Sequence, residues 1–503
     1  MDSHHNVLIL PFIMPLLLLW LIITLRVAAS NEEGVFNVMN YDAKADAKVD
    51  DSKAFLSAWS AACSYSQGES TMLIPEGSYL VGPLTFKGQC AGKVKFQLNG
   101  NLLASTNIDD FAPENANGTM KNWVEFKYVD GLNITGGGVL DGQGASAWPY
   151  NNCTVEKHCT RLPITLVLSF VTSGSVSGIS SIDSKFFHMV VYGCKEMTID
   201  SVTIRAPHDS PNTDGIHIGA SSVVSVLSST IGTGDDCISI GPDVTNVTIT
   251  NVTCGPGHGI SVGSLGQGLN DKHVEGLTVT KCTFNRSDNG VRIKTWQTSV
   301  SSPIAAHFLF QDMTMINVRN PIIIDQRYCP NSHCNATEPS KVQIKDVKFR
   351  DFRGTSSSKA AISLVCSEWY PCQDIELSNI ALDYNGPNPD IKNATSICVN
   401  AQGTSFGTMN PKSCLTPPQS SSHLPNSHRK YSQRPFCLAN SRCLERRRPF
   451  CVMLLSASRA AATRVVGAHC LARLPSGGSV NFHSLFLVPV LVPIILVRYN
   501  EDD

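Results

Sequence analysis

The sequence predicts an all-β protein folded as a single-domain parallel β-helix, in which successive coils of the chain stack along one axis. Asp214, Asp236 and His258 follow one another at a constant interval, and each precedes the same short apolar alternation. A fixed period that carries a strand each time is typical of a solenoid. The composition, 42% hydrophobic and only 16% charged with 37 glycines, suits strands and tight turns better than helical bundles.

The first element is an apolar N-terminal segment. Residues from Val7 to Leu25 are nearly all apolar, and the small residues Val27 and Ala29 match the cleavage pattern of a signal peptide. We therefore expect residues 1–29 to be a signal peptide that is removed from a secreted protein. The alternative is an uncleaved membrane anchor, because the apolar run is long enough to cross a bilayer.

A helix is expected between residues 50 and 59, where apolar side chains occur at positions 54, 55, 58 and 59. This short helix precedes the first coil. It would therefore cover the end of the core that the first coil leaves exposed, as solenoids require. We expect the β-helix domain as a whole to span residues 30–415.

The clearest row of strands lies in the middle of this domain, where the interval between strands is constant at first and then lengthens after His258. Its apolar pairs are Ile216/Ile218, Ile238/Ile240, Ile260/Val262, Val291/Ile293 and Ile322/Ile324. Alternation places these side chains inside and the intervening His217, Ser239, Ser261 and Arg292 on the outer surface. Burying ionised carboxylates without partners is too costly, so each strand should begin after its Asp. Asp214 and Asp236 would then face a groove.

The strand pattern stops near residue 415, and we expect residues 416–503 to form a tail outside the fold. Residues 421–503 contain 11 basic and 4 acidic side chains, so 29 basic and 37 acidic side chains remain before them. An acidic body argues against nucleic acid as a partner. A lipid-anchor signal at the C-terminus is a weaker alternative, because the charged end from Arg498 to Asp503 does not match the required apolar terminus.

The cysteines and glycosylation signals favour the secretory route. Of the 18 cysteines, 14 fall between Cys63 and Cys414, where disulfides are expected in an oxidising compartment. Cys329 with Cys334 and Cys366 with Cys372 are plausible pairs, although the sequence does not fix the connectivity. Eight Asn-x-Ser/Thr sites are present, at Asn117, Asn133, Asn152, Asn246, Asn251, Asn285, Asn335 and Asn393.

The acidic positions of the repeat predict proton-transfer chemistry. Residues at equivalent positions of stacked parallel strands lie about 4.8 Å apart. Carboxyl groups that lie so close together push their pKa values apart, which lets one act as an acid while a neighbour remains a base. Four short motifs follow in order along the chain: Ser210-Pro211-Asn212-Thr213-Asp214-Gly215, Gly234-Asp235-Asp236, Gly257-His258-Gly259 and Arg292-Ile293-Lys294.

In these four motifs the sequence, from about Phe36 to Cys414, resembles the polygalacturonase family of glycoside hydrolases. The resemblance implies a right-handed β-helix and hydrolysis, with inversion, of the α-1,4 bonds between galacturonic acid units in pectin. It implies Asp235 as the general acid, Asp214 and Asp236 as the pair that holds and deprotonates water, and His258 as the group that orients the acid. The residues implied in binding the substrate are Asn212, Arg292, Lys294 and Tyr328. Arg292 and Lys294 could instead be solvated strand charges, and Tyr328 could serve packing.

Three further segments resemble the exopolygalacturonases of plant pollen, which remove single galacturonate units from the non-reducing end. They are Lys121–Gly131, Asp141–Cys153 and Asp183–His188. The resemblance implies a monomer that acts in the cell wall on pectin or polygalacturonate, without a cofactor, a metal or, once mature, a membrane. Endo action remains an alternative. A calcium-dependent pectate lyase and a noncatalytic pectin-binding β-helix are less favoured, the latter because all three carboxylates are present.

Overall fold

The computed structural model describes residues 33–113, 119–151, 161–330, 334 and 338–417. All of them belong to one compact unit, Met1–His423. The predicted signal peptide and the tail beyond residue 417 lie outside the described residues. So do the glycosylation signals at Asn117, Asn152 and Asn335. The boundaries expected at residues 29 and 415 therefore stay predictions.

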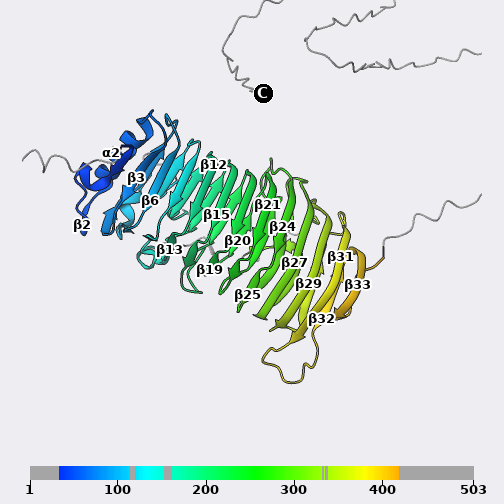
Figure 1. Ribbon diagram of the computed structural model, residues 1–503. Helices are drawn as coiled ribbons and strands as arrows, with labels where there is room; N and C mark the ends of the chain where they lie inside the picture. The colour runs from blue at the N-terminus through cyan, green and yellow to red at the C-terminus, as the bar shows by residue number, and fades with distance from the viewer. Residues whose placement is uncertain (1–32, 114–118, 152–160, 331–333, 335–337, 418–503) are drawn as a thin grey trace, which may run out of the picture. The chain divides into compact units, whose positions relative to one another are not determined.

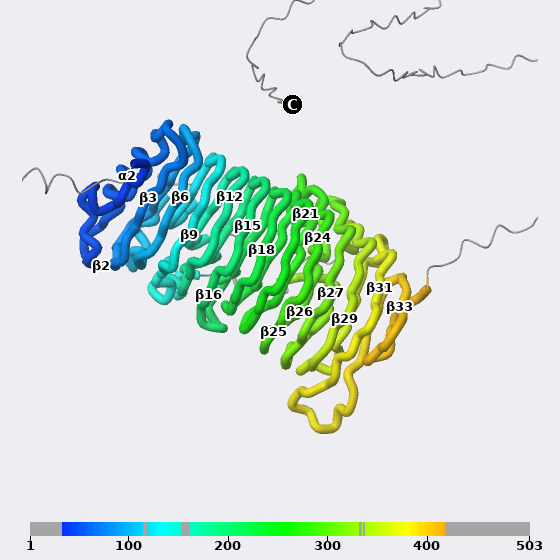
Figure 2. Tube along the Cα trace, in the orientation of Figure 1, coloured from blue at the N-terminus to red at the C-terminus, as the bar shows by residue number. Residues whose placement is uncertain are grey.

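The described chain forms a stack of β-coils, in which every strand pairs in parallel with the equivalent strand of the coils before and after it (Figures 1 and 2). One sheet contains eleven strands, and it carries the predicted site. In chain order these are β5 (Leu84–Lys87), β8 (Val124–Lys127), β11 (Leu166–Ser169), β14 (Met189–Tyr192), β17 (Ile216–Gly219), β20 (Ile238–Ile240), β23 (Ile260–Leu265), β26 (Asn289–Trp296), β28 (Asn320–Tyr328), β30 (Ala360–Val365) and β32 (Thr395–Val399).

The second sheet contains 22 strands in two rows that merge at β27. The longer row is β1 (Val35–Asn37), β3 (Ser70–Ile74), β6 (Val94–Leu98), β9 (Leu132–Thr135), β12 (Thr172–Ser177), β15 (Lys195–Asp200), β18 (Ser222–Leu227), β21 (Val244–Thr250), β24 (Val274–Thr280), β27 (Ile304–Val318), β29 (Gln343–Ser356), β31 (Cys372–Tyr384) and β33 (Ala401–Asn410). The shorter row is β2 (Asp46–Asp50), β4 (Ser78–Val81), β7 (Asn101–Ala104), β10 (Val139–Asp141), β13 (Ser180–Ile182), β16 (Thr203–Arg205), β19 (Thr230–Gly232), β22 (Thr253–Cys254) and β25 (Thr283–Asn285).

The strand register confirms the predicted apolar row. Ile216 pairs with Ile238, Ile238 with Ile260, and Ile260 with Val291. All four side chains are buried in the interior of the coils. Because the backbone hydrogen bonds fix this register, positions that are equivalent in the repeat become neighbours in space.

The predicted N-terminal helix is confirmed as α2 (Ser52–Ser64), and within the described chain it is accompanied only by the short 3-10 turns η1 (Val38–Tyr41), η2 (Ile108–Phe111), η3 (Gly144–Ser146) and η4 (Trp148–Tyr150). Its buried residues include Ala54, Phe55, Ala58 and Trp59. The Trp59 ring packs 5.0 Å from Phe86 and 5.4 Å from Phe126, centroid to centroid. Its indole N–H donates to the carbonyl of Lys87. The helix thus covers the first coils at the blue end of Figure 1.

Five disulfides brace the described coils: Cys63–Cys90, Cys237–Cys254, Cys329–Cys334, Cys366–Cys372 and Cys398–Cys414. The two pairs that the sequence suggested are both present. Cys237–Cys254 follows Asp236 directly and ties the start of β20 to β22 in the opposite sheet. Among the described residues, no helix has the length and apolar character needed to span a membrane.

Candidate active site

Most of the predicted site residues lie around one cavity of about 570 Å³, outside the eleven-stranded sheet. Its lining includes Asn212, Asp214, Asp235, Asp236, Lys294 and Tyr328. His258 and Arg292 complete the set, because each bonds to a carboxylate that lines the cavity. The structure therefore brings together residues that are far apart in the sequence, as the stacked repeat predicted.

The strands begin after the aspartates and both aspartates line the cavity, as expected, but the two residues are more buried than a position facing a groove implied. β17 starts at Ile216 and β20 at Ile238, yet Asp214 is only 6% exposed and Asp236 only 1%. Ser239 and Ser261, expected on the outer surface, are buried too. The reason is that both carboxylates have hydrogen-bond partners, which removes most of the cost of burying them.

Asp236 is held by two cations from the same sheet. Its Oδ1 accepts from Nη2 of Arg292 at 2.7 Å and from the hydroxyl of Ser261 at 2.7 Å. Its Oδ2 accepts from Nζ of Lys294 at 2.8 Å. Burial by itself would raise the pKa of Asp236, but the charges of Lys294 and Arg292 outweigh it and hold this pKa below its ordinary range. Asp236 is therefore ionised.

Asp214 forms no ion pair with a described residue, and its pKa moves in the opposite direction even though the charge of Lys294 acts to lower it. Burial raises the pKa of Asp214 well above its ordinary value, and the nearby carboxylates of Asp235 and Asp236 raise it further. Its Oδ2 accepts a hydrogen bond of 2.9 Å from Ser239, whose hydroxyl oxygen lies 2.8 Å from Nδ1 of His217. Because the Ser239 hydroxyl donates to Asp214, the Nδ1 of His217 donates to Ser239.

Asp235 differs from both neighbours in its environment. It is more open to the cavity, and its Oδ1 lies 2.9 Å from Nδ1 of His258. Asn212 donates to its Oδ2 over 3.4 Å. The hydrogen bond to Asp235 raises the pKa of His258, against the effect of burial. The other ring nitrogen of His258 lies 3.9 Å from Asp288. The three carboxyl groups of the cavity thus occupy three electrostatically different positions.

Arg292 and Lys294 are not the solvated strand charges that the sequence left open. Both are largely buried, and both bond to Asp236. The Lys294 ammonium also lies 5.3 Å from the centroid of the Tyr328 ring, which packs edge-on against Trp296 at 5.9 Å. Tyr328 therefore faces the cavity and packs at the same time. Whether these cations hold a substrate carboxylate stays a prediction.

The structure adds residues that the sequence analysis did not identify as part of the site. Ser239 donates to Asp214, and Ser261 donates to Asp236. His217 bonds to Ser239, and Arg161 lines the cavity. The two serines and His217 could have been found, since they occupy the outward positions next to the apolar row. Arg161 could not, because it lies in a stretch without strand periodicity.

Asp235, Asp236 and His258 offer ligand atoms within 4.8 Å of one another, so we tested whether they fit a metal ion. Both oxygens of Asp236 already accept from cationic side chains. A divalent cation would have to displace Arg292 and Lys294 or lie beside them, at an electrostatic cost. The donor set therefore fits proton transfer better than calcium binding.

Comparison with known proteins places this geometry in a family. Residues 63–407 match the family described as glycosyl hydrolases family 28. An exopolygalacturonase of Zea mays is 45% identical over 387 residues, which are 77% of this chain and 92% of the maize protein. An exopolygalacturonase of Platanus acerifolia is 44% identical over 75% of this chain and 97% of its own length.

Solved structures agree on the fold. The endo-xylogalacturonan hydrolase of Aspergillus tubingensis superposes with a TM-score of 0.62 at 24% identity, over 75% of this chain and 100% of its own. A hyperthermoactive exopolygalacturonase of Thermotoga maritima gives a TM-score of 0.59 at 18% identity, over 70% and 87%. At such identities these structures support the fold alone, a right-handed parallel β-helix. From the family match and the close plant relatives, we conclude that this chain is a glycoside hydrolase and belongs to glycosyl hydrolases family 28.

Proposed function

We propose that this protein is a secreted exopolygalacturonase that removes galacturonic acid units from pectin by acid/base hydrolysis of α-1,4 bonds. The observation that carries the proposal is the difference in environment among three adjacent carboxyl groups. Asp236 is held ionised by Lys294 and Arg292, Asp214 has a raised pKa, and Asp235 is open to the cavity beside His258. The exo mode is supported by the plant relatives named exopolygalacturonase at 44–45% identity.

Asp235 is the proposed general acid. In its protonated form it gives its proton to the glycosidic oxygen as the bond between that oxygen and the anomeric carbon breaks, and it is left as a carboxylate. An imidazolium at His258 donates from Nδ1 to this carboxylate and so stabilises the anion that forms. Asn212, which donates to the other oxygen, fixes the orientation of the carboxyl group.

Asp236 is the proposed general base. It accepts a proton from the water that attacks the anomeric carbon, while Asp214 holds this water through a hydrogen bond. Attack on the face opposite to the leaving group would invert the configuration. The nearest oxygens of Asp235 and Asp236 lie within 4.8 Å of each other, closer than the about 6.5–9.5 Å usual between the acid and the base of an inverting enzyme, so their separation does not itself support inversion. Asp236 then returns the proton to solvent and Asp235 is reprotonated, which restores the starting state.

The cations of the cavity predict a preference for uronates. Arg161, Arg292 and Lys294 line the cavity or border it, and the Tyr328 ring packs beside Lys294. A substrate carboxylate could form an ion pair with one of these cations, whereas its uncharged methyl ester could not. The same cations oppose a lyase that depends on calcium, and membership of a hydrolase family points the same way.

One product analysis tests the proposal. The protein is incubated with a hexagalacturonate labelled at its reducing end, and the products are separated over time. Exo action should release unlabelled monogalacturonate and shorten the labelled chain one unit at a time. Early appearance of labelled dimers and trimers would mean endo action. An unsaturated, ultraviolet-absorbing product whose formation stops when a chelator is added would indicate a lyase. If no cleavage is detected, the protein is a noncatalytic pectin-binding protein.

A further inference from the structure

Three exposed aromatic rings form a ladder beside the active site. The rings belong to Tyr128, Phe170 and Tyr192, which lie on three consecutive coils. Their exposed fractions are 52%, 41% and 48%. The rings of Tyr128 and Phe170 stack with centroids 5.2 Å apart and an interplanar angle of 16°. Phe170 and Tyr192 meet edge to face at 5.8 Å. Large exposed apolar patches on soluble proteins commonly mark binding sites.

The local backbone of the ladder is costly. Tyr128 and Phe170 follow directly after β8 and β11, and both have positive φ angles, of 58° and 54°. Bulky residues rarely adopt this left-handed conformation. Gly193 provides space for Phe170, since a Cβ atom at this glycine would lie 2.5 Å from the ring. The turns after β8 and β11 therefore tolerate a strained backbone, and the turn after β14 contains a glycine. In this arrangement the aromatic rings face solvent.

The ladder runs along the same sheet toward the active-site cavity. Tyr192 pairs with Gly219 in the next coil, and Ile218 pairs with Ile240, which sets Gly219 beside Gly241. Gly241 lines the cavity. A ligand lying on the rings could therefore continue over the two glycines into the site.

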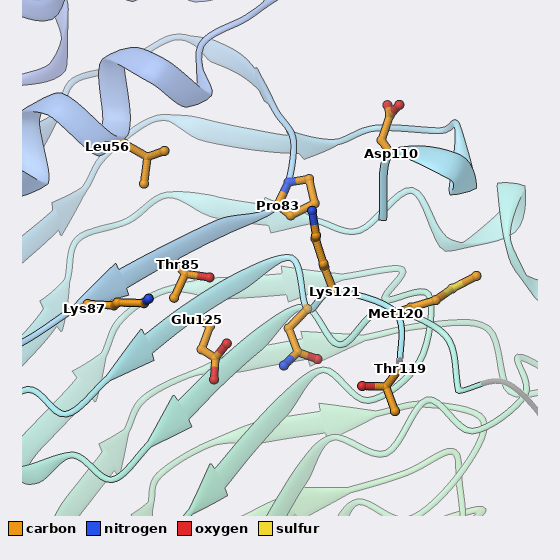
Figure 3. Close-up of a pocket in the computed structure, with 10 residues that line it drawn as sticks. Leu56, Pro83, Thr85, Lys87, Asp110, Thr119, Met120, Lys121 and Glu125 are labelled. Carbon is orange, nitrogen blue, oxygen red and sulfur yellow. The ribbon is translucent and has the colours of Figure 1, made fainter. Parts of the chain in front are cut away.

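Positive charges accompany the rings at the other end of the ladder. The Lys127 ammonium lies 5.6 Å from the centroid of the Tyr128 ring, and Lys127 pairs in register with Lys87 of β5. Lys87 lines a second cavity, of about 690 Å³, together with Thr85 and Glu125 from the outward positions of β5 and β8 (Figure 3). Lysines beside exposed rings suit an acidic sugar chain, whose C–H faces stack on the rings while its carboxylates meet the ammonium groups.

We propose that Tyr128, Phe170 and Tyr192, with Lys87 and Lys127, form an ancillary binding surface for the polyuronate chain, remote from the bond that is cleaved. This inference rests on the proposed function, because it takes an acidic polysaccharide as the substrate. The surface holds the polymer and raises its concentration at the cavity. A substrate of two units fills only the active-site cavity and does not reach the rings.

The first test compares long and short substrates. Tyr128→Ala and Tyr192→Ala, singly and together, should raise KM for polygalacturonate by about 2- to 10-fold per ring, the usual strength of an aromatic contact. The values of kcat, and kcat/KM for digalacturonate, should not change. Phe406→Ala is the matched control, because Phe406 is 54% exposed but lies on β33 in the other sheet. Equal KM values in the ring variants and the control would overturn the proposal, as would an equal loss on digalacturonate.

The second test measures binding without turnover. In the Asp235→Asn background, the Tyr128/Tyr192 double variant should bind immobilised polygalacturonate more weakly than its parent, and high salt should weaken the binding of both. Neither protein should bind immobilised dextran, a neutral polymer. If the parent binds dextran and the double variant does not, the rings bind polymers nonspecifically, and the proposal is overturned. Failure of the proposed function would be seen separately, as an unmutated protein that cleaves neither substrate.

Discussion

Lys294 and Asp236 form a buried ion pair between residues 58 positions apart, with 2.8 Å from Nζ to Oδ2. The two residues lie on or beside strands β26 and β20, with β23 between them, and Ser261 of β23 bonds to the same carboxylate. The pair fixes the charge of the proposed base before any substrate arrives. Because the pair is buried, its loss should change both the free energy of unfolding and the ionisation of Asp236.

Breaking this pair should destabilise the protein. Lys294→Met leaves Asp236 buried with only Arg292 and Ser261 as partners, and the loss of one member of a buried pair costs on the order of 3 kcal/mol. Adding Asp236→Asn should recover part of the loss, because a buried carboxylate that has lost one of its two cationic partners is then replaced by a neutral amide. Lys272→Met is the control, since Lys272 pairs with Asp243 in solvent. Urea unfolding of the four proteins measures the effect. A double variant no more stable than Lys294→Met would contradict the prediction.

The raised pKa of Asp214 predicts how stability depends on pH. The folded state holds the Asp214 proton more tightly than the unfolded chain, whose aspartate pKa is about 3.9. The contribution of Asp214 to stability is therefore complete below that value and is lost as the pH rises through the folded-state pKa. Asp214→Asn cannot ionise, so it should be more stable than the unmutated protein at neutral pH and should flatten this part of the pH profile, at the cost of activity. Parallel pH profiles for the two proteins would show that the assignment is wrong.

Replacing the proposed acid should remove activity and leave the fold intact. General acid catalysis contributes about 10²- to 10⁴-fold, so Asp235→Asn should lower kcat by at least ~10². The midpoint of thermal unfolding should change little, because Asp235 is the least buried of the three carboxyl groups. Asp374→Asn, an exposed aspartate on β31, serves as the control. Turnover near normal in folded Asp235→Asn would exclude Asp235 as the acid.

The folded unit should persist without the predicted tail. Thr416 still bridges Gln402, and the backbone N–H of Gly403 donates to the carbonyl of Thr416. A protein of residues 31–417 keeps these contacts and should be soluble, fully active and at least as heat-stable as the full chain. Circular dichroism and the release of reducing sugar measure this. If the shortened protein unfolds or loses activity, the tail is needed to cover the last coil.

Much of the fold could be predicted because the coil repeat is short and regular. The constant interval between Asp214, Asp236 and His258 was enough to align the strands that follow them. The alternation of apolar residues identified the interior side, and the α2 face at Ala54, Phe55, Ala58 and Trp59 was equally clear. Both signals depend on local periodicity, which the chain displays directly.

The electrostatics of the site could not be predicted in the same way. The burial of Asp236 depends on Arg292 and Lys294, which come much later in the sequence, on coils of unequal length. Their convergence on one carboxylate is a property of side-chain conformations that no spacing encodes. The aromatic ladder was missed for a related reason, since Tyr128, Phe170 and Tyr192 follow one another at unequal intervals along the chain.

The glycines that follow the ladder have a consequence for engineering. Gly219 and Gly241 occupy the next two coil positions after Tyr192, and neither needs a left-handed backbone. A Cβ atom would meet its nearest neighbour at 3.4 Å at Gly219 and at 3.3 Å at Gly241, contacts that a small shift of a side chain relieves. Equivalent positions on successive coils lie about 4.8 Å apart along the axis, and at these two positions the residue has no side chain. A side chain installed there would stand between the ladder and the cavity, so we expect a larger residue at either position to separate polymer binding on the rings from cleavage in the cavity.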